Sequence, residues 1–382
     1  MDFSLNKAQK ALQEQVTDFC ERHYNAQIAA SLDEEPEYPE ALHAAMAEAG
    51  LLGHCQPSDF GGSDGMVMDA VIINQVLGGY GDAAANIFFI NFIGAVLIGL
   101  AGTKAQKQQI LPDVIRGRHR LAFALTEPDA GSDAGSIQCR ATPGKNGYAL
   151  QGTKLYTTGA EQADTILTVA LTDPDAGAKR GSSVLLVPAR APGIEIEALP
   201  KLGGNAVASC RVSYNEVQVD SDALLGEREN TAWGSLMIGA GLERVLVAAS
   251  CLGRAEQILT EVIDFTRERR QFGQPIAGFQ AIQHQIADMA TDIEAMRWLV
   301  YHAAWQLDTG QDPVQAVAMA KLFSAEHLNS IVNRGMHLLG GRAYLRECSM
   351  QRHLRESFLG LYAGGTAEIQ RNLIARKLNL DT

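Results

Sequence analysis

One stretch of the chain combines hydroxyl, amide and carboxylate groups at a density that suits ligand binding. Residues 123–133 read FALTEPDAGSD, and they join an apolar run to a loop of glycine, serine and aspartate. Such a loop presents several backbone N–H groups and hydroxyls at close range, which suits an anion or a polar heterocycle. A tight loop between two strands has the same composition, so these residues alone leave both interpretations open.

The elements that must position this loop follow from the hydrophobic periodicity. Residues 1–120 have apolar side chains at helical spacing, whereas residues 121–229 have short alternating or β-branched runs separated by Gly, Asp and Pro. Residues 230–382 return to long helical patterns, with only Pro313 after position 276. We therefore predict an α+β fold, mostly α, with an N-terminal helical domain, a middle antiparallel β domain and a C-terminal helical bundle.

The bulk composition excludes several classes of protein. The chain has 382 residues, 46% of them hydrophobic, and a formal net charge of −12, as is ordinary for a globular protein of two or three domains. This charge argues against nucleic-acid binding and against docking on anionic lipid. The six cysteines lack C-x-x-C or His-Cys spacing, so we expect reduced thiols and no metal site. Charges in the first ten residues argue against a signal peptide, and we expect a cytoplasmic protein.

The stretch at residues 83–102 has about the length of a membrane span. Two asparagines and several small residues interrupt it, and no basic flank marks a cytoplasmic side. We expect a helix buried in a helical domain and no membrane span. The chain also has no G-x-G-x-x-G after a strand, no P-loop and no G-x-S-x-G elbow, so a cofactor would bind by another route.

Taken together, the motifs of the chain resemble those of the acyl-CoA dehydrogenase family over essentially its whole length. FALTEPDAGSD is similar to the flavin-contacting signature of that family, and GTKLYTTGA at 152–160 to the segment beside the flavin ring. RRQFGQPIAGFQ at 269–280 resembles the stretch that holds the FAD of a neighbouring subunit. HLLGGRAY at 337–344 and GTAEIQRNLIAR at 365–376 resemble the last two FAD-contacting segments.

The resemblance implies the family's three-domain fold, bound FAD, a homotetramer and an electron-transfer flavoprotein as electron acceptor. Arg269, Phe272 and Gln280 would contact the FAD across a subunit interface, and Ser132 would also contact the substrate. Tyr156 stands where the family more often has Trp, and the segment that begins at His337 more often begins with Gln. The implied cofactor-binding residues are Phe123, Leu125, Thr126, Ser132, Tyr156, Thr158, Arg269, Phe272, Gln280, His337, Gly340, Gly341, Thr366 and Glu368.

Members of the family abstract an α-proton from an acyl thioester while a β-hydride moves to flavin N5. The base is commonly a Glu two residues before the Thr of a Tyr-Glu-Gly-Thr run, but Gly364 occupies that position here. A subset that includes the isovaleryl-CoA dehydrogenases keeps the base on another helix, at the position of Glu243 in GAGLERVLVAAS. The resemblance thus implies Glu243 as the base and the Gly364 N–H as a donor to the thioester carbonyl. A glycine at 364 also leaves space for a branched or cyclic acyl group.

The helical neighbours of Glu243 are unusual for a carboxylate. Gly239, Ala240, Leu246 and Val247 lie three and four residues away, and burial on such a face should raise the pKa toward the range of a general base. Alternatively, Glu243 pairs with a basic residue of another helix and only stabilises the bundle. Arg244 is either the pocket arginine of the family, in contact with substrate, or half of a structural ion pair.

The thioester carrier is open between CoA and a carrier protein. Residues 201–209, KLGGNAVAS, depart from the commoner Lys-Leu-Gly-x-Arg-x-Ser pattern of the family, because Asn205 and Val207 replace its Arg and Ser. The start MDFSLN, the YAGGT element and the ARKL end are similar to flavoproteins that oxidise prolyl or aminoacyl groups on carrier proteins, and to crotonobetainyl-CoA reductase-like proteins. Two other classes remain: a flavin monooxygenase, which would consume oxygen and hydroxylate its product, and a non-catalytic flavin-holding subunit, which thioester-driven flavin reduction would exclude.

Overall fold

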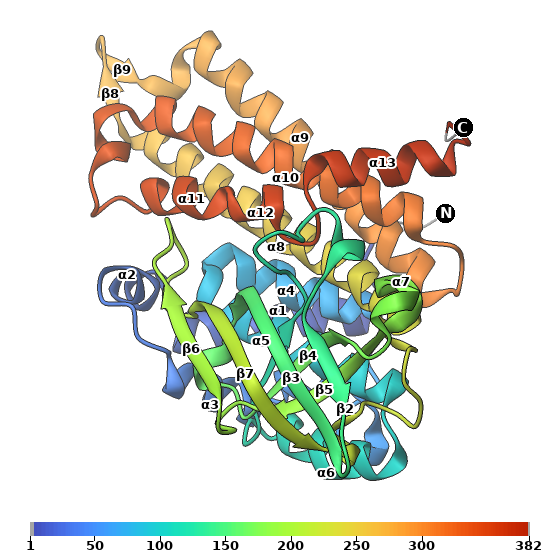
Figure 1. The fold of residues 1–382 in the computed structure, drawn as a ribbon. Helices are drawn as coiled ribbons and strands as arrows, with labels where there is room; N and C mark the ends of the chain where they lie inside the picture. Colours follow the sequence, from blue (N-terminus) through green and yellow to red (C-terminus); the bar gives the residue numbers. More distant parts are fainter. Residues whose placement is uncertain (1–3, 381–382) are drawn as a thin grey trace.

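The computed structural model of the protein describes residues 4–380, so Met1–Phe3 of the MDFSLN similarity lie outside the described residues. Helices come first along the chain, strands second and helices again last (Figure 1). The predicted α+β fold, mostly α, is confirmed. The first set of helices consists of α1 (Lys7–His23), α2 (Ala26–Glu34), α3 (Glu40–Glu48), α4 (Val67–Tyr80), α5 (Asp82–Ala101) and α6 (Lys104–Ile115).

Local sequence signals explain where several of these helices begin. Asn6 and Gln9 form a reciprocal capping box before α1, with both hydrogen bonds at 2.9 Å. Thr103 and Gln106 form another before α6. Pro112 lies inside α6, which continues to Ile115.

A seven-stranded sheet follows, with the strand order β1-β4-β2-β3-β7-β6 and β5 paired with β4. One expectation needs correction, because the sheet is mixed: β1 and β2 both run parallel to β4. A parallel pair needs a long connection, and the loop at 125–139 and the β2–β3 hairpin supply the chain between β1 and β4. The strands are β1 (Leu121–Ala124), β2 (Arg140–Pro143), β3 (Gly147–Thr158), β4 (Thr165–Leu171), β5 (Ser182–Pro188), β6 (Ile194–Leu199) and β7 (Ser209–Asp220).

Long helices make up the C-terminal part and cover one end of the sheet region (Figure 1). A two-stranded hairpin, β8 (Arg270–Gln271) and β9 (Gln274–Pro275), separates the first two of them. The helices are α8 (Ala232–Glu268), α9 (Gln280–Asp308), α10 (Val314–Leu339), α11 (Ser349–Ser357), α12 (Leu359–Tyr362) and α13 (Ala367–Lys377).

Within residues 4–380, α5 and α8 have the length and hydropathy of a membrane span. In α5, 72% of the most apolar window is buried, and the helix packs on α4, α8 and β1. The expectation that residues 83–102 form a buried helix is therefore confirmed. A helix that is apolar on all sides is typical of such a position in a large core.

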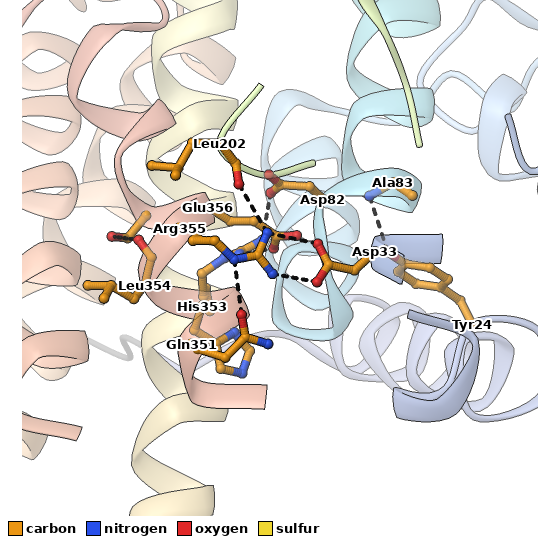
Figure 2. A network of polar contacts seen from close by, with 12 residues as sticks. Tyr24, Asp33, Asp82, Ala83, Leu202, Gln351, His353, Leu354, Arg355 and Glu356 are labelled. Atoms are coloured by element: carbon orange, nitrogen blue, oxygen red, sulfur yellow. Dashed lines mark hydrogen bonds and ion pairs between the residues drawn. The ribbon is translucent and has the colours of Figure 1, made fainter. Parts of the chain in front are cut away.

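A network of buried charges joins helices from both helical regions. The Arg254 guanidinium on α8 forms ion pairs with Asp82 at the start of α5 and with Glu356 on α11. Figure 2 shows that Arg355, which directly precedes Glu356 on α11, contacts Asp33 of α2 and the backbone carbonyl of Leu202. The loop after β6 thus meets both helical regions at this network.

Candidate active site

A narrow cavity lies between the end of β1, helix α5 and the first half of α8. Together with its open mouth it holds about 410 Å³ of empty space, and its lining is apolar except for one carboxylate. That carboxylate belongs to Glu243. The lining residues are Ile93, Leu97, Phe123, Leu125, Ala134, Trp233, Leu236, Met237, Gly239, Ala240 and Glu243.

Glu243 is half-buried on α8, in the wall of this cavity. Burial raises the pKa of its carboxyl above the ordinary value of 4.5, while the charges of Arg244 and Lys321 and a hydrogen bond from the Gly364 backbone amide partly oppose this rise. Among residues 4–380, Glu243 forms no ion pair with a Lys, Arg or His side chain. The alternative of an ion pair with another helix therefore finds no support in the structure.

Gly364 lies directly beside Glu243, in the turn between α12 and α13. Its φ of +68° is in the left-handed region, and a Cβ built on it would lie 3.3 Å from Arg244 Cγ and 3.6 Å from Glu243 Cγ. The side chains of Arg244 and Glu243 thus lie within contact distance of this glycine, and the expectation that it leaves space for a branched or cyclic acyl group stays a prediction. Arg244 itself donates from Nε to the Gly364 carbonyl at 2.9 Å.

Two further buried polar side chains hold the same turn, and sequence reasoning missed both. Lys321 on α10 donates from Nζ to the Gly365 carbonyl at 2.6 Å, and Gln370 on α13 donates to the carbonyls of Gly364 and Gly365. A signal was present for Lys321, since it stands alone in the apolar run AVAMAKLFSA, much as Glu243 does on α8. For Gln370 we find no such signal.

The last two predicted residues of this turn lie at the start of α13. The Thr366 hydroxyl accepts a hydrogen bond from the Ile369 amide and caps the helix. Glu368 is exposed in the first turn, where hydrogen bonds from its own backbone amide and from the Thr366 hydroxyl lower the pKa of its carboxyl. The structure therefore places both residues next to the glycine pair that faces Glu243, with Thr366 already engaged as a cap.

The FALTEPDAGSD loop leaves β1 at the cavity and is held by a buried ion pair that sequence reasoning also missed. The fully buried ammonium of Lys154 on β3 donates to Glu127 at 2.7 Å and to the Leu125 carbonyl at 2.8 Å. The Glu127 carboxylate also accepts from the amides of Gln138 and Cys139. These contacts close the loop from both ends, so Phe123 and Leu125 keep their place in the cavity wall.

The loop and the end of β3 present groups that fit a flavin. Tyr156 has a φ of +59° at an irregularity in the β3–β7 pairing, which turns its ring outward with 65% of its surface exposed. Ser132 is exposed, and the amides at 131–133 make no backbone hydrogen bond within the described part of the chain. Unpaired amides, hydroxyls and an aromatic face beside a half-buried Phe123 suit the polar edges and apolar faces of an isoalloxazine. Thr126 and Thr158, both half-buried, lie at the same strand ends.

The remaining predicted cofactor residues gather elsewhere, and none of them lines the cavity. They lie around the β8–β9 hairpin and the end of α10, which Figure 1 shows at the end of the bundle away from the sheet. The two places are linked where Arg342 lies over the Phe265 ring at 5.7 Å. All are exposed, and Phe272 is 93% exposed with a φ of +50°. They are Arg269, Phe272, Gln280, His337, Gly340 and Gly341.

Comparisons with known proteins identify the whole chain. Models of the acyl-CoA dehydrogenase N-terminal, middle and C-terminal domains match residues 6–118, 122–217 and 232–379. A probable acyl-CoA dehydrogenase, YngJ of Bacillus subtilis, is 34% identical over 380 residues, which are 99% of this chain and 100% of that protein. The caffeyl-CoA reductase-Etf complex subunit CarC of Acetobacterium woodii is 32% identical, over 97% of each chain.

Solved structures agree in fold and cofactor. The FAD complex of PigA superimposes with a TM-score of 0.95 and 28% identity over the full length of both chains. The prolyl acyl carrier protein oxidase AnaB has a TM-score of 0.92 and 25% identity, over 98% of this chain and 100% of that one. The domain matches cover nearly the entire sequence in the order of its helices and strands, and the residues at the cavity fit a flavin. The chain therefore belongs to the acyl-CoA dehydrogenase family, whose members are FAD-dependent oxidoreductases that act on CH–CH bonds.

Proposed function

We propose that the protein catalyses the α,β-dehydrogenation of a short acyl thioester, with Glu243 as the base that removes the α-proton. The observation that carries this proposal is the position of Glu243. It is the one carboxylate in an otherwise apolar cavity, next to the strand end whose Phe123 and Leu125 form the opposite wall. A raised pKa makes a carboxylate a stronger proton acceptor, as a general base requires.

Gly364 contributes its backbone amide. In the absence of substrate this N–H donates to the Glu243 carboxyl and lowers the pKa of that group. A thioester carbonyl in the cavity competes for the same N–H, and its capture transfers the donor from the base to the developing enolate oxygen. The Glu243 pKa then rises further, so substrate binding itself strengthens the base. One such donor typically lowers an activation barrier by about 3 kcal/mol.

FAD, when bound, supplies the acceptor for the hydride that leaves the β-carbon. Phe123, Leu125, Thr126, Tyr156 and Thr158 would hold its ring system beside the cavity. The exposed residues around the β8–β9 hairpin would meet the FAD of a neighbouring subunit, which requires at least a dimer and supports the homotetramer we infer. The relative that belongs to an Etf complex supports an electron-transfer flavoprotein as the electron acceptor.

The cavity favours small acyl groups. Leu97 and Gly239 pack against each other at its side, where a Cβ on Gly239 would already lie 3.1 Å from Leu97 Cδ2. The side chains of Arg244 and Glu243 lie close beside Gly364, so a straight or singly branched short chain fits better than a bulky ring.

A second candidate differs only in the carrier of the thioester. AnaB, the structural relative with a TM-score of 0.92, acts on a prolyl group attached to an acyl carrier protein. In this chain, the Asn205 side chain forms hydrogen bonds within its own loop. It accepts from the Lys201 amide at 3.0 Å and donates to the Lys201 carbonyl at 3.1 Å. It therefore replaces the arginine of the commoner family pattern without offering a free cation.

The test is anaerobic reduction of the bound flavin. The reduction is measured as the loss of the visible absorbance of the flavin. Purified protein is titrated with butyryl, isovaleryl and prolyl thioesters, each on CoA and on a carrier protein. Bleaching by a CoA ester supports the leading proposal, and bleaching by carrier-bound groups alone supports the second candidate. If no thioester bleaches the flavin, both proposals fail, and oxygen consumption then distinguishes a monooxygenase from a non-catalytic subunit.

A further inference from the structure

Lys321 is a buried cation whose partners are backbone carbonyls. It lies in the first third of α10 with no exposed surface, and Nζ is 2.6 Å from Gly365 O and 3.3 Å from Leu361 O. Burying an ammonium is costly, and an apolar side chain of similar volume would usually stabilise such a site better. The position of this charge therefore calls for an explanation beyond packing.

The carbonyls that Lys321 holds belong to the turn that faces Glu243. Gly365 O accepts from Lys321 and from Gln370 Nε2, the latter at 2.9 Å. Gly364 O accepts from Arg244 Nε at 2.9 Å and from Gln370 Nε2 at 3.1 Å. Both carbonyls of the glycine pair thus point into buried donors, and the amide of Gly364 is left to face the Glu243 carboxyl.

We propose that Lys321 is a positioning residue for the reaction: its buried ammonium clamps the carbonyls of Leu361 and Gly365, and thereby holds the Gly364 amide where Glu243 and a thioester carbonyl meet. This inference rests on the proposed function and adds to it a residue from a third helix. Neither glycine has a side chain to anchor it, and both have positive φ values of +68° and +92°. Without the clamp, the glycine pair has wide conformational freedom.

The charge of Lys321 also acts on the base directly. It favours the ionised form of Glu243 and so lowers the pKa of that carboxyl. The groups that face Lys321 are Cys251, Arg244 and Glu243 on α8 and Glu368 on α13. Burial, chiefly, lowers the pKa of Lys321 to about 8, so the charge is present at neutral pH and is lost as the pH rises through that value.

The test compares Lys321→Met with Ser324→Ala in the FAD-loaded protein. Ser324 is equally buried one turn farther along α10, and its hydroxyl has no hydrogen-bond partner in the described part of the chain, so it is a matched control. Hydrogen exchange of the peptide that covers residues 359–370 is measured by mass spectrometry. Loss of a charged hydrogen bond should speed exchange there about tenfold or more in K321M and leave S324A unchanged.

The second measurement is the pH profile of flavin reduction by a thioester. K321M should reduce flavin more slowly at pH 7, and its acid limb should move to higher pH because the Glu243 pKa rises; S324A should match the wild type. Unchanged exchange in K321M would overturn the clamp, and faster exchange with an unchanged rate and profile would overturn the role in the reaction.

Failure of this role differs visibly from failure of the proposed function. In the first case wild type and K321M are reduced equally fast, whereas in the second no thioester reduces the wild type. If K321M does not fold, Lys321→Gln is measured in its place, because it retains a neutral donor. Compared with the wild type, K321Q should exchange faster over residues 359–370 and should shift the acid limb upward, and an unshifted limb would overturn the proposal.

Discussion

A side chain at position 364 would lie in contact with the side chain of Glu243. A Cβ on Gly364 would lie 3.6 Å from Glu243 Cγ, although the two residues are on different elements and 121 positions apart in the chain. The family's more usual base position and the position of Glu243 therefore converge from two different elements on adjoining places. We expect a carboxylate at either position to reach the same substrate proton.

This convergence predicts that the base can be moved. Glu243→Gly should abolish flavin reduction, and Glu243→Gly combined with Gly364→Glu should recover a measurable part of it. The recovery will be incomplete, because a side chain at a φ of +68° costs about 1–2 kcal/mol. Single-turnover flavin reduction with the best thioester measures both variants. A double variant no faster than Glu243→Gly at equal FAD content would contradict the shared position.

The raised pKa of Glu243 sets the pH dependence of the reaction. The base must be ionised, so the rate of flavin reduction should fall as the pH decreases through a pKa above the ordinary 4.5. Glu243→Gln, which keeps the size of the side chain, should lower the rate by about 10² to 10⁴-fold and remove this acid limb. If the E243Q variant retains the limb, another group must titrate.

The order of elements could be predicted because it is a local signal, and Glu243 was singled out by the family resemblance together with its apolar helix face. Helical spacing, alternating strands and a lone carboxylate on an apolar face are each visible within a few residues. The parallel pairing of β1 with β4 was not predicted, because the sequence of Leu121–Ala124 does not indicate which strand will pair with it. A strand of four buried residues has no distinct pattern for a parallel or an antiparallel neighbour.

The contacts that support the site could not be predicted, because their partners are far apart in the chain. Arg254 and Asp82 are 172 residues apart, and Gly364 and Arg244 are 120 apart. A sequence shows that a charge falls in an apolar run, as with Lys321, but not which carbonyl or carboxylate compensates it. The residues of the β8–β9 hairpin are a different case, since one chain alone leaves them exposed.

The buried pair of Lys154 and Glu127 should control FAD binding without contacting the substrate. Lys154→Met removes the donor to both Glu127 and the Leu125 carbonyl, and leaves an uncompensated carboxylate at 7% exposure. We expect loosened FAD, measured as a rise in its dissociation constant of about tenfold or more. Lys145→Met, which changes an exposed lysine in the β2–β3 turn, is the control and should bind FAD normally. Equal FAD affinity in both variants would argue that the loop holds its shape without the pair.

The exposed Phe272 should matter for assembly. Its ring is 93% exposed at the tip of a hairpin with strained backbone, and it meets the ring of Phe279 edge-on at 6.1 Å between centroids. Phe272→Ala should lower both the oligomer size, measured by light scattering, and the FAD content. Met66, 53% exposed at the start of α4, provides the comparison, and Met66→Ala should change neither quantity. A full-sized, fully loaded Phe272→Ala protein would refute the cross-subunit role.

The Arg254 network should be the most sensitive point for stability. Arg254→Met leaves Asp82 and Glu356 buried without their cation, which typically destabilises a fold by about 3–5 kcal/mol. Burial raises the pKa of Glu356, and Asp82 adds to that rise, so removal of Arg254 must raise it further. The folded state then binds more protons than the unfolded state, and stability increases as the pH falls toward 4.5. Thermal unfolding of R254M should therefore show its largest loss of stability relative to the wild type near pH 8 and a smaller loss at about pH 5.5.

The control is Arg211→Met, which breaks the exposed pair with Glu197 and should cost less than about 1 kcal/mol of stability at either pH. An equally small loss of stability in R254M would mean that the buried carboxylates find other partners.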